Sequence, residues 1–333
     1  MKELFGYTKD GREVYRITLK DKGGNSVALI SYGAVIQSLV FRNVDVVLGY
    51  DTVGEYESQN GCLGAVIGRC ANRIGGGRFV LDGRIIELSK NKATYQIHGG
   101  FEGFGNKIWD FEECENSVIF SLFSPDTDEG YPGNLEACVR YTFTDGVLDV
   151  VYDAFADKKT VINLTNHSYF NLDGCGNILD HTLFLDCDRV AWSDSYSIPD
   201  GRLFDVRDSV FDFLTPKKIG RDFNSTEDLF ASKKGYDHNF IVRDGGKFKK
   251  VGLLSSEKTG ISMEISTDMP DVVVYTANTL GKRPGKGKSE IGQYSGICFE
   301  TQYMTNAVNL EGFAKPVFDA GEHFRQHTCF RFL

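Results

Sequence analysis

The sequence predicts an all-β protein built as a large antiparallel β-sandwich. Short stretches of alternating apolar and polar residues are repeatedly joined by Asp-Gly, the dipeptide typical of tight hairpins. No stretch of about twelve or more residues combines amphipathic periodicity with a helix start cap and a glycine stop. The 37 glycines and 25 phenylalanines also fit many turns and sheets with aromatic cores.

The expected hairpins are spread along the whole chain. Their Asp-Gly pairs occupy residues 82–83 and 145–146, with weaker signals at residues 10–11 and 244–245. No Pro-rich or Ser-rich linker interrupts this pattern, and no repeat of fixed period is visible. We therefore expect residues 1–333 to form one domain, a sandwich of many short strands.

Composition and charge exclude several functional classes. The 46 acidic and 37 basic side chains give a net charge of −9, and no run of Lys or Arg is long enough to follow a phosphate backbone, so nucleic acid is not an expected partner. The sequence contains no stretch of about eighteen apolar residues and shows no apolar leader at its start. Neither membrane insertion nor secretion is therefore expected. The eight cysteines never form Cys-x-x-Cys and favour buried free thiols in a reducing cytoplasm, with a disulfide framework as the alternative.

Motifs for nucleotides, metals and serine nucleophiles are missing from the sequence. The glycines at 75–77 precede a strand pattern and lack the Lys-Ser/Thr ending of a phosphate loop, and no Gly-x-Gly-x-x-Gly opens a helix. His323 and His327 lie in an alternating, strand-like stretch, where a spacing of four gives no helical metal face. No Gly-x-Ser-x-Gly elbow is present. We therefore expect neither cofactor nor metal, and carboxylate and imidazole chemistry remains.

A carboxylate lies within an apolar strand near the end of the sequence. Alternation along residues 296–302 places Cys298, Glu300 and Gln302 on one face, and Ile297 and Phe299 on the other. Glu300 is then either a surface residue or a buried acid or base.

Residues 161–172 carry polar and aromatic groups more densely than a core strand needs. If this stretch is extended, one face carries a row of five such side chains, which are Asn163, Thr165, His167, Tyr169 and Asn171. Amide and phenol groups can bind the hydroxyls of a sugar, and an imidazole can move a proton near neutral pH. The alternative is a structural histidine with satisfied hydrogen bonds.

Two weaker signals complete the set of candidate residues. His98 is followed by two glycines that let another group approach its imidazole. Asp237 enters an apolar strand, a position that suits hydroxyl binding as well as a turn. Neither signal decides the function alone.

Taken in order, these segments resemble the galactose mutarotase family of aldose 1-epimerases. The matching motifs are GRCANRI at residues 68–74, HGG at 98–100, NLTNHSYFNL at 163–172, DHNF at 237–240 and ETQ at 300–302. The resemblance extends from about residue 6 to residue 332. It implies a β-sandwich of the galactose mutarotase type and an isomerase that interconverts the α and β anomers of a free aldohexose such as galactose or glucose.

The resemblance also implies a role for each matched catalytic position. Glu300 is expected to remove the proton of the anomeric hydroxyl, and His167 to protonate the ring oxygen, with His98 as a second donor beside that oxygen. These roles require Glu300 to be ionised and His167 to be charged, and they need no cofactor.

By the same resemblance, Asn72, Arg73 and Asp237 are expected to bind the sugar through its hydroxyls. The sequence departs from the family pattern at Tyr95, at Val273 and at residues 304–307 (MTNA). These departures concern the choice of sugar more than the reaction.

Three other functions remain as alternatives. An epimerase of a phosphorylated hexose would need added cations, and the motifs supply only Arg69 and Arg73. A noncatalytic sugar-binding module would be expected to lack Glu300 or His167. A glycoside hydrolase could use Glu300 with Asp237 as its two carboxylates, although the histidine-rich motifs argue against it.

Overall fold

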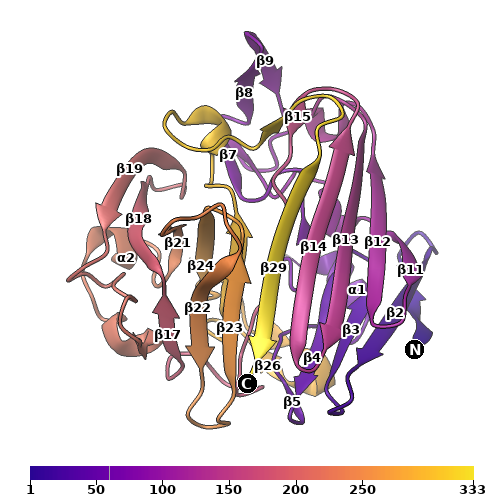
Figure 1. The fold of residues 1–333 in the computed structure, drawn as a ribbon, viewed down its shortest axis with the longest axis vertical. Helices are drawn as coiled ribbons and strands as arrows, with labels where there is room; N and C mark the ends of the chain where they lie inside the picture. The colour runs from indigo at the N-terminus through magenta and orange to yellow at the C-terminus, as the bar shows by residue number, and fades with distance from the viewer. Residues whose placement is uncertain (60) are drawn as a thin grey trace.

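The largest element of the fold is a nine-stranded antiparallel sheet (Figure 1). The computed structural model describes residues 1–59 and 61–333. In spatial order the sheet contains β11 (Asp110–Glu113), β12 (Ser117–Ser124), β13 (Leu135–Thr144), β14 (Val147–Ala156), β29 (Phe324–Phe332), β23 (Ser262–Thr267), β22 (Lys249–Ser255), β17 (Thr182–Leu185) and β20 (Lys217–Lys218). The C-terminal strand β29 lies in the interior of this sheet, between β14 and β23.

Two five-stranded antiparallel sheets accompany it. The first contains β1 (Lys2–Tyr7), β2 (Glu13–Lys20), β3 (Ser26–Ile30), β4 (Val35–Phe41) and β5 (Val44–Asp45). The second contains, in spatial order, β19 (Pro199–Asp205), β18 (Cys187–Ser193), β21 (Asp237–Val242), β24 (Asp271–Tyr275) and β27 (Cys298–Gln302). The second sheet carries the two candidate carboxylates, at the start of β21 and in the middle of β27.

Short ribbons and helical turns connect the sheets. The two-stranded ribbons are β6 (Val66–Ile67) with β16 (Thr165–Asn166), β7 (Arg73–Gly75) with β10 (Tyr95–Ile97), β8 (Arg78–Leu81) with β9 (Arg84–Glu87), β15 (Thr160–Val161) with β28 (Val317–Phe318), and β25 (Arg283–Pro284) with β26 (Glu290–Ile291). The α-helices are α1 (Val53–Ser58) and α2 (Asp228–Ala231). In the described part of the chain, no helix has the length and apolarity needed to cross a membrane.

The main hydrophobic core lies between the nine-stranded sheet and the two five-stranded sheets, which makes the fold a sandwich. Every second residue of β13 is buried, because successive side chains of a strand point to opposite faces. These side chains pack in one cluster with residues of both five-stranded sheets, such as Leu29 and Phe240. The layers are also joined by a hydrogen bond of 2.8 Å from the Tyr141 hydroxyl to the Ala34 carbonyl. The predicted all-β sandwich is confirmed.

The two strong hairpin signals are also confirmed. β8 pairs with β9 across residues 82–83, and β13 pairs with β14 across residues 145–146. In each turn the Asp and the Gly both have positive φ, which matches the twist of the flanking strands. The weaker signal at residues 10–11 likewise joins β1 to β2.

The prediction of a hairpin at residues 244–245 is wrong. β21 ends at Val242 in a five-stranded sheet, whereas β22 begins at Lys249 in the nine-stranded sheet. The connection therefore crosses between layers and passes close to Pro270, whose Cα would lie 2.8 Å from a Cβ added at Gly245. The dipeptide specifies a turn but does not specify which strand pairs next.

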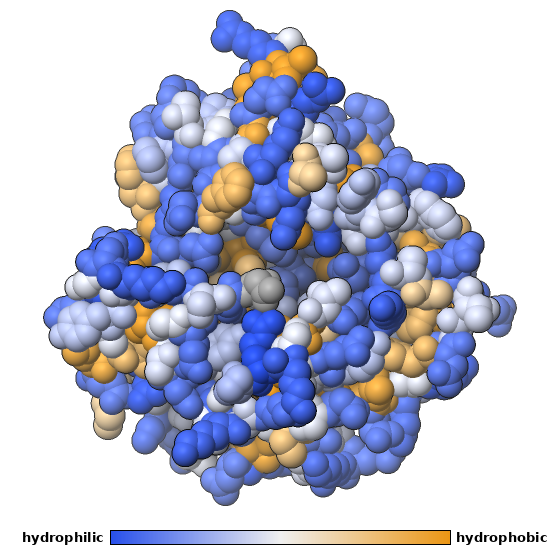
Figure 2. Space-filling view, turned by 180° about the vertical axis from the view of Figure 1, so that it is seen from behind, coloured by the Kyte–Doolittle hydropathy of each residue, from blue (hydrophilic) through white to orange (hydrophobic). Residues whose placement is uncertain are grey.

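All eight cysteines carry free thiols. Cys70, Cys187 and Cys298 are buried as expected, but Cys114 and Cys175 are exposed, so the expectation of buried thiols is wrong for these two. On the face opposite to that of Figure 1, the surface has a central hollow that is surrounded largely by hydrophilic side chains (Figure 2).

Candidate active site

Three side chains that are far apart in the sequence meet in one cluster. His98 directly follows β10, His167 directly follows β16, and Glu300 lies in the middle of β27. One nitrogen or oxygen atom from each residue lies within 4.8 Å of the corresponding atoms of the other two. The fold therefore brings together the three residues that the sequence nominated for catalysis.

Glu300 is a buried carboxyl group rather than a surface residue, with 2% of its surface exposed. Its Oε1 lies 3.6 Å from Nε2 of His167, which is beyond a good hydrogen bond. Its Oε2 is buried and, among the described residues, has no hydrogen-bond partner. This oxygen is therefore able to form a hydrogen bond with a bound molecule.

Aromatic rings hold the imidazole of His167 on several sides. The Tyr169 ring stacks on it with centroids 5.0 Å apart, while Tyr275 and His98 approach it edge-on at 6.2 Å and 5.4 Å. The hydroxyl of Tyr169 donates to the Gly61 carbonyl, and that of Tyr275 is paired with Thr279, so neither hydroxyl serves the imidazole. These rings restrict the orientation of the His167 ring and contribute to its burial.

Burial shifts the two partners toward their neutral forms. Desolvation raises the pKa of Glu300 to about 8, and nearby Asp237 adds to the effect. Desolvation also lowers the pKa of His167 to about 4. The free site at neutral pH therefore favours the neutral forms of both groups, the opposite of the charges that their expected roles require, because a dry site disfavours both charges.

His98 is held by a reciprocal backbone contact with Asn72. The His98 N–H donates to the Asn72 carbonyl at 3.0 Å, and the Asn72 N–H donates to Nδ1 of His98 at 3.2 Å. Burial lowers the pKa of His98 well below its usual value, so the ring is neutral. Since Nδ1 accepts a hydrogen bond, the ring proton lies on Nε2.

The turn after His98 depends on glycine. Gly99 has φ +80°, and a Cβ at this position would lie 1.8 Å from the Gly68 carbonyl oxygen. The two turns that carry the motifs at residues 68–74 and 98–100 are therefore packed directly against each other. This contact explains why a glycine must follow His98.

The cluster has the ligand types of a metal site, with two imidazoles and a carboxyl group. A metal ion needs a free lone pair on each ligand. In His98 the Nδ1 lone pair accepts the Asn72 N–H, and Nε2 carries the proton. Neither nitrogen of His98 is available, so the arrangement suits a hydrogen-bond donor better than a metal ligand.

Asn72 positions the side chain of Arg73. The amide oxygen of Asn72 accepts hydrogen bonds from the backbone N–H and from Nη1 of Arg73, both at 3.0 Å. Arg73 also lies over the ring of Tyr95, with its guanidinium carbon 5.8 Å from the centroid. The guanidinium is thereby directed along the site toward Asp237.

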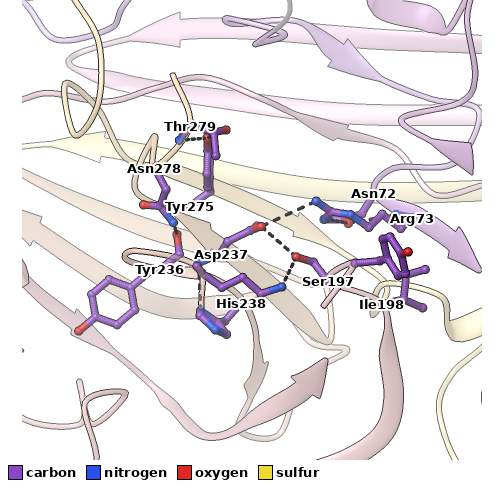
Figure 3. A network of polar contacts seen from close by, with 12 residues as sticks. Asn72, Arg73, Ser197, Ile198, Tyr236, Asp237, His238, Tyr275, Asn278 and Thr279 are labelled. Atoms are coloured by element: carbon purple, nitrogen blue, oxygen red, sulfur yellow. Dashed lines mark hydrogen bonds and ion pairs between the residues drawn. The ribbon is translucent and has the colours of Figure 1, made fainter. Parts of the chain in front are cut away.

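Asp237 lies between Arg73 and Ser197 (Figure 3). Its Oδ2 is 3.8 Å from Nη2 of Arg73 and accepts a hydrogen bond of 3.4 Å from the Ser197 hydroxyl. The neighbouring His238 anchors the strand, because its Nδ1 accepts the Asp237 N–H at 2.9 Å and its Nε2 bonds the Leu229 carbonyl at 3.1 Å. The substrate-binding candidates Asn72, Arg73 and Asp237 thus form one connected group.

Sequence reasoning missed two members of this network. Lys233 donates from Nζ to the Ser197 hydroxyl at 2.6 Å and to the Asp194 carbonyl at 3.2 Å. Both Lys233 and Ser197 belong to connecting segments without strand or motif signals, and only the fold brings them next to Asp237. Lys233 is the second cation at this end of the site, in addition to Arg73.

The expected polar row at residues 163–171 does not form a ligand-binding face. Only Thr165–Asn166 is a strand, and the amides at both ends of the row bond the protein itself. Asn163 bonds the N–H and carbonyl of Tyr303, while Asn171 donates to the Ser295 carbonyl at 2.9 Å. These amides brace neighbouring loops, and within the row His167 is the side chain that reaches the cluster.

Arg69 and the positions that depart from the family pattern lie in different surroundings. Arg69 is buried and donates to the Ser124 hydroxyl and to the carbonyls of residues 124, 125, 132 and 133, so it binds the protein rather than a ligand. Val273 is buried and pairs with Glu300 across β24 and β27. Tyr95 is half-buried beside Arg73, and Met304 packs in a small apolar cluster.

A β-sandwich with a buried imidazole and carboxyl pair, bordered by an Arg and Asp network, defines an acid–base enzyme for a hydroxyl-rich substrate. The chain belongs to the aldose 1-epimerase family, whose model matches residues 15–331. The expected family is confirmed, and the chain is an isomerase of the aldose 1-epimerase class.

Relatives with the names galactose mutarotase and aldose 1-epimerase match nearly the full length of the chain. It is 37% identical to the aldose 1-epimerase of Haemophilus influenzae, with 97% of each chain covered. It is also 37% identical to the galactose mutarotase of Bos taurus, over 92% of this chain and 90% of the relative. Its fold superimposes on the crystal structure of a galactose 1-epimerase from Lactobacillus acidophilus with a TM-score of 0.89, at 29% identity, covering 100% of this chain and 98% of the other.

Proposed function

We propose that this protein interconverts the α and β anomers of a free aldohexose, such as galactose or glucose, by general acid–base catalysis. The proposal is carried by the buried pair of His167 and Glu300, whose facing atoms are 3.6 Å apart and not hydrogen-bonded to each other. A pair in this arrangement keeps a donor and an acceptor available for two neighbouring substrate oxygens.

The reaction requires that one proton is removed from the anomeric hydroxyl and that one proton is added to the ring oxygen, O5. Glu300 takes the proton of the anomeric hydroxyl, the C1–O5 bond breaks, and O5 receives a proton from His167. C1 becomes the aldehyde carbon, and rotation about C1–C2 presents its opposite face. Return of O5 to C1 with the two proton transfers reversed yields the other anomer.

The pKa shifts fit this cycle once the protons are counted. An ionised Glu300 with a charged His167 holds one proton, and so does a neutral Glu300 with a neutral His167. Ring opening converts the first arrangement into the second. The dry site that raises the pKa of Glu300 and lowers that of His167 therefore favours the protonation state of the open-chain aldehyde.

The other candidates have distinct parts in this proposal. The neutral His98, protonated on Nε2, serves as a second donor near O5. Arg73 and Asp237, held by Asn72 and Ser197, bind the hydroxyls of the sugar through charge-assisted hydrogen bonds.

A phosphorylated hexose fits the site less well. Arg69 already donates its hydrogen bonds to backbone carbonyls. Nζ of Lys233 lies 2.6 Å from Oγ of Ser197, and Ser197 also donates to the carboxylate of Asp237. This carboxylate would repel a phosphate. A noncatalytic sugar-binding role would not need an imidazole and a carboxyl group that face each other at 3.6 Å in one buried pair.

Polarimetry tests the function directly. Fresh α-galactose, α-glucose and glucose 6-phosphate are followed with and without the protein. Accelerated rotation change with the free sugars supports the proposal. Acceleration with the phosphorylated sugar alone would overturn it in favour of the phosphohexose alternative.

We further propose that the chain acts in the cytoplasm as a single domain. Eight free thiols support a reducing compartment, and one family model spanning residues 15–331 supports a single unit. A single cooperative transition in calorimetry is the expected result.

A further inference from the structure

A thiol lies against the second nitrogen of the proposed acid. Sγ of Cys298 is 3.5 Å from Nδ1 of His167, while Nε2 of the same ring is 3.6 Å from Oε1 of Glu300. Cys298 and Glu300 are two residues apart on β27, so both point to the same face of the strand. Two side chains of one strand therefore lie next to the two nitrogens of the imidazole.

Apart from the backbone of His167 itself, which also hydrogen-bonds the ring, no described residue other than Cys298 is hydrogen-bonded to a ring nitrogen of His167. The stacked Tyr169 and the edge-on Tyr275 use their hydroxyls elsewhere, on the Gly61 carbonyl and on Thr279. They can hold the plane of the ring, but they cannot decide which nitrogen carries the proton. Cys298 is the side chain placed to do so.

We propose that Cys298 is a positioning residue, whose sulfur accepts the Nδ1–H of His167 and so leaves Nε2 as the nitrogen that exchanges a proton with the substrate. The inference rests on the proposed function. A ring that gives its Nε2 proton to O5 must keep the other proton on Nδ1 while it is neutral. Sulfur is a weak acceptor, sufficient to retain that proton.

The choice of sulfur also suits the electrostatics of the site. Burial keeps the pKa of Cys298 well above its usual value, so the thiol remains uncharged. A carboxylate at this place would stabilise the charged imidazole. An uncharged, weak acceptor orients the ring without opposing the return of His167 to its neutral form.

The two histidines would then be opposite tautomers. The backbone N–H of Asn72 holds the proton of His98 on Nε2, and Cys298 holds that of His167 on Nδ1. This contrast can be measured in the free enzyme by ¹⁵N NMR of histidine-labelled protein, which distinguishes a protonated from an unprotonated ring nitrogen. The chain has six histidines, and His167→Asn identifies the signals of His167.

The test compares wild type with Cys298→Ala, which removes the acceptor, and Cys298→Ser, which restores one. In wild type at neutral pH we expect a protonated Nδ1 and an unprotonated Nε2. Cys298→Ala should redistribute the proton between the nitrogens and lower kcat about 10-fold, the effect of losing one hydrogen bond, with KM little changed. Cys298→Ser should recover the wild-type pattern and most of kcat.

Cys187→Ala is the matched control, because Cys187 is also a buried thiol but lies on β18, outside the cluster. It should change neither the tautomer nor kcat, and melting temperatures verify that all variants are folded. An unprotonated Nδ1 in an active wild-type enzyme overturns the inference while leaving the proposed function intact. A wild-type tautomer and kcat in Cys298→Ala would overturn it as well. Absence of mutarotation in wild type would instead contradict the proposed function.

Discussion

Nε2 of His167 and Oε1 of Glu300 face each other at 3.6 Å, and both residues are almost fully buried. The separation is too long for a strong mutual hydrogen bond and short enough for both groups to reach adjacent oxygens of one ligand. In the proposed mechanism the pair acts as a unit that exchanges protons with its substrate, and its titration belongs to the pair.

The pH dependence of kcat/KM should be bell-shaped, with limbs near pH 4 and pH 8. Below the pKa of His167, about 4, both groups are protonated and no base remains. Above the pKa of Glu300, about 8, both have lost their proton and no acid remains. Between these values the pair holds the one proton that the reaction needs. Initial rates by polarimetry in constant-ionic-strength buffers check this, and a profile rising steadily beyond pH 9 would contradict it.

Replacing the proposed base should abolish most turnover. Glu300→Gln keeps the shape of the side chain and removes its basicity, so kcat should fall by roughly 100- to 10,000-fold. Circular dichroism and melting temperature serve as controls for folding. Near-normal turnover in a folded variant would assign the base to another residue.

The two histidines should differ in their kinetic effects. His167→Asn removes the proton donor and should mainly lower kcat, whereas His98→Asn removes a positioning donor and should change both kcat and KM. The centroids of the two rings are 5.4 Å apart, so the effects of the two substitutions need not add. The double variant should therefore be measured with the single variants. If His167→Asn alters only KM while His98→Asn abolishes turnover, the acid is His98.

Gly99→Ala should damage the site more than its backbone conformation alone explains. The added Cβ would lie 1.8 Å from the Gly68 carbonyl oxygen, so the turn carrying His98 must move. Gly83→Ala is the matched control, because Gly83 also has positive φ, +74°, but has open space around it. Both variants should lose about 1 kcal/mol or more of stability from strain. Only Gly99→Ala should lose most of kcat/KM, and equal losses in the two would refute the packing argument.

Mutarotation should not depend on a metal ion. Neither nitrogen of His98 offers a free lone pair, so the cluster lacks one of its three would-be ligands. Protein treated with a strong chelator and then dialysed should retain full activity by polarimetry. Activity that disappears and returns on adding Zn²⁺ would show that the tautomer of His98 is assigned wrongly.

Local sequence patterns predicted the fold where the structure is locally determined. Alternation of apolar residues and Asp-Gly turns identified β8 with β9 and β13 with β14, because a two-residue turn imposes both the pairing and its register. The same dipeptide at residues 244–245 failed, since the strands it joins pair with partners elsewhere in the chain. Pairing between distant strands is decided by the whole core.

The sequence predicted which residues form the candidate site, but not their burial, their protonation or all of their neighbours. Motifs nominated His98, His167 and Glu300, and the fold brings them together. The roles of Glu300 and His167 indicated which protonation states the reaction requires but not the pKa values, because desolvation comes from neighbours that no motif contains. Lys233 and Ser197 could not be found, since only the packing of two irregular segments places them beside Asp237.

The interior position of β29 has a consequence for folding kinetics. β14 ends at residue 156 and β23 begins at residue 262, yet both depend on residues 324–332 to occupy the space between them. Contacts of such long sequence separation give a high contact order, which slows folding. Until β29 is inserted, β14 and β23 expose edges that can recruit other chains, so refolding yield should fall steeply as protein concentration rises.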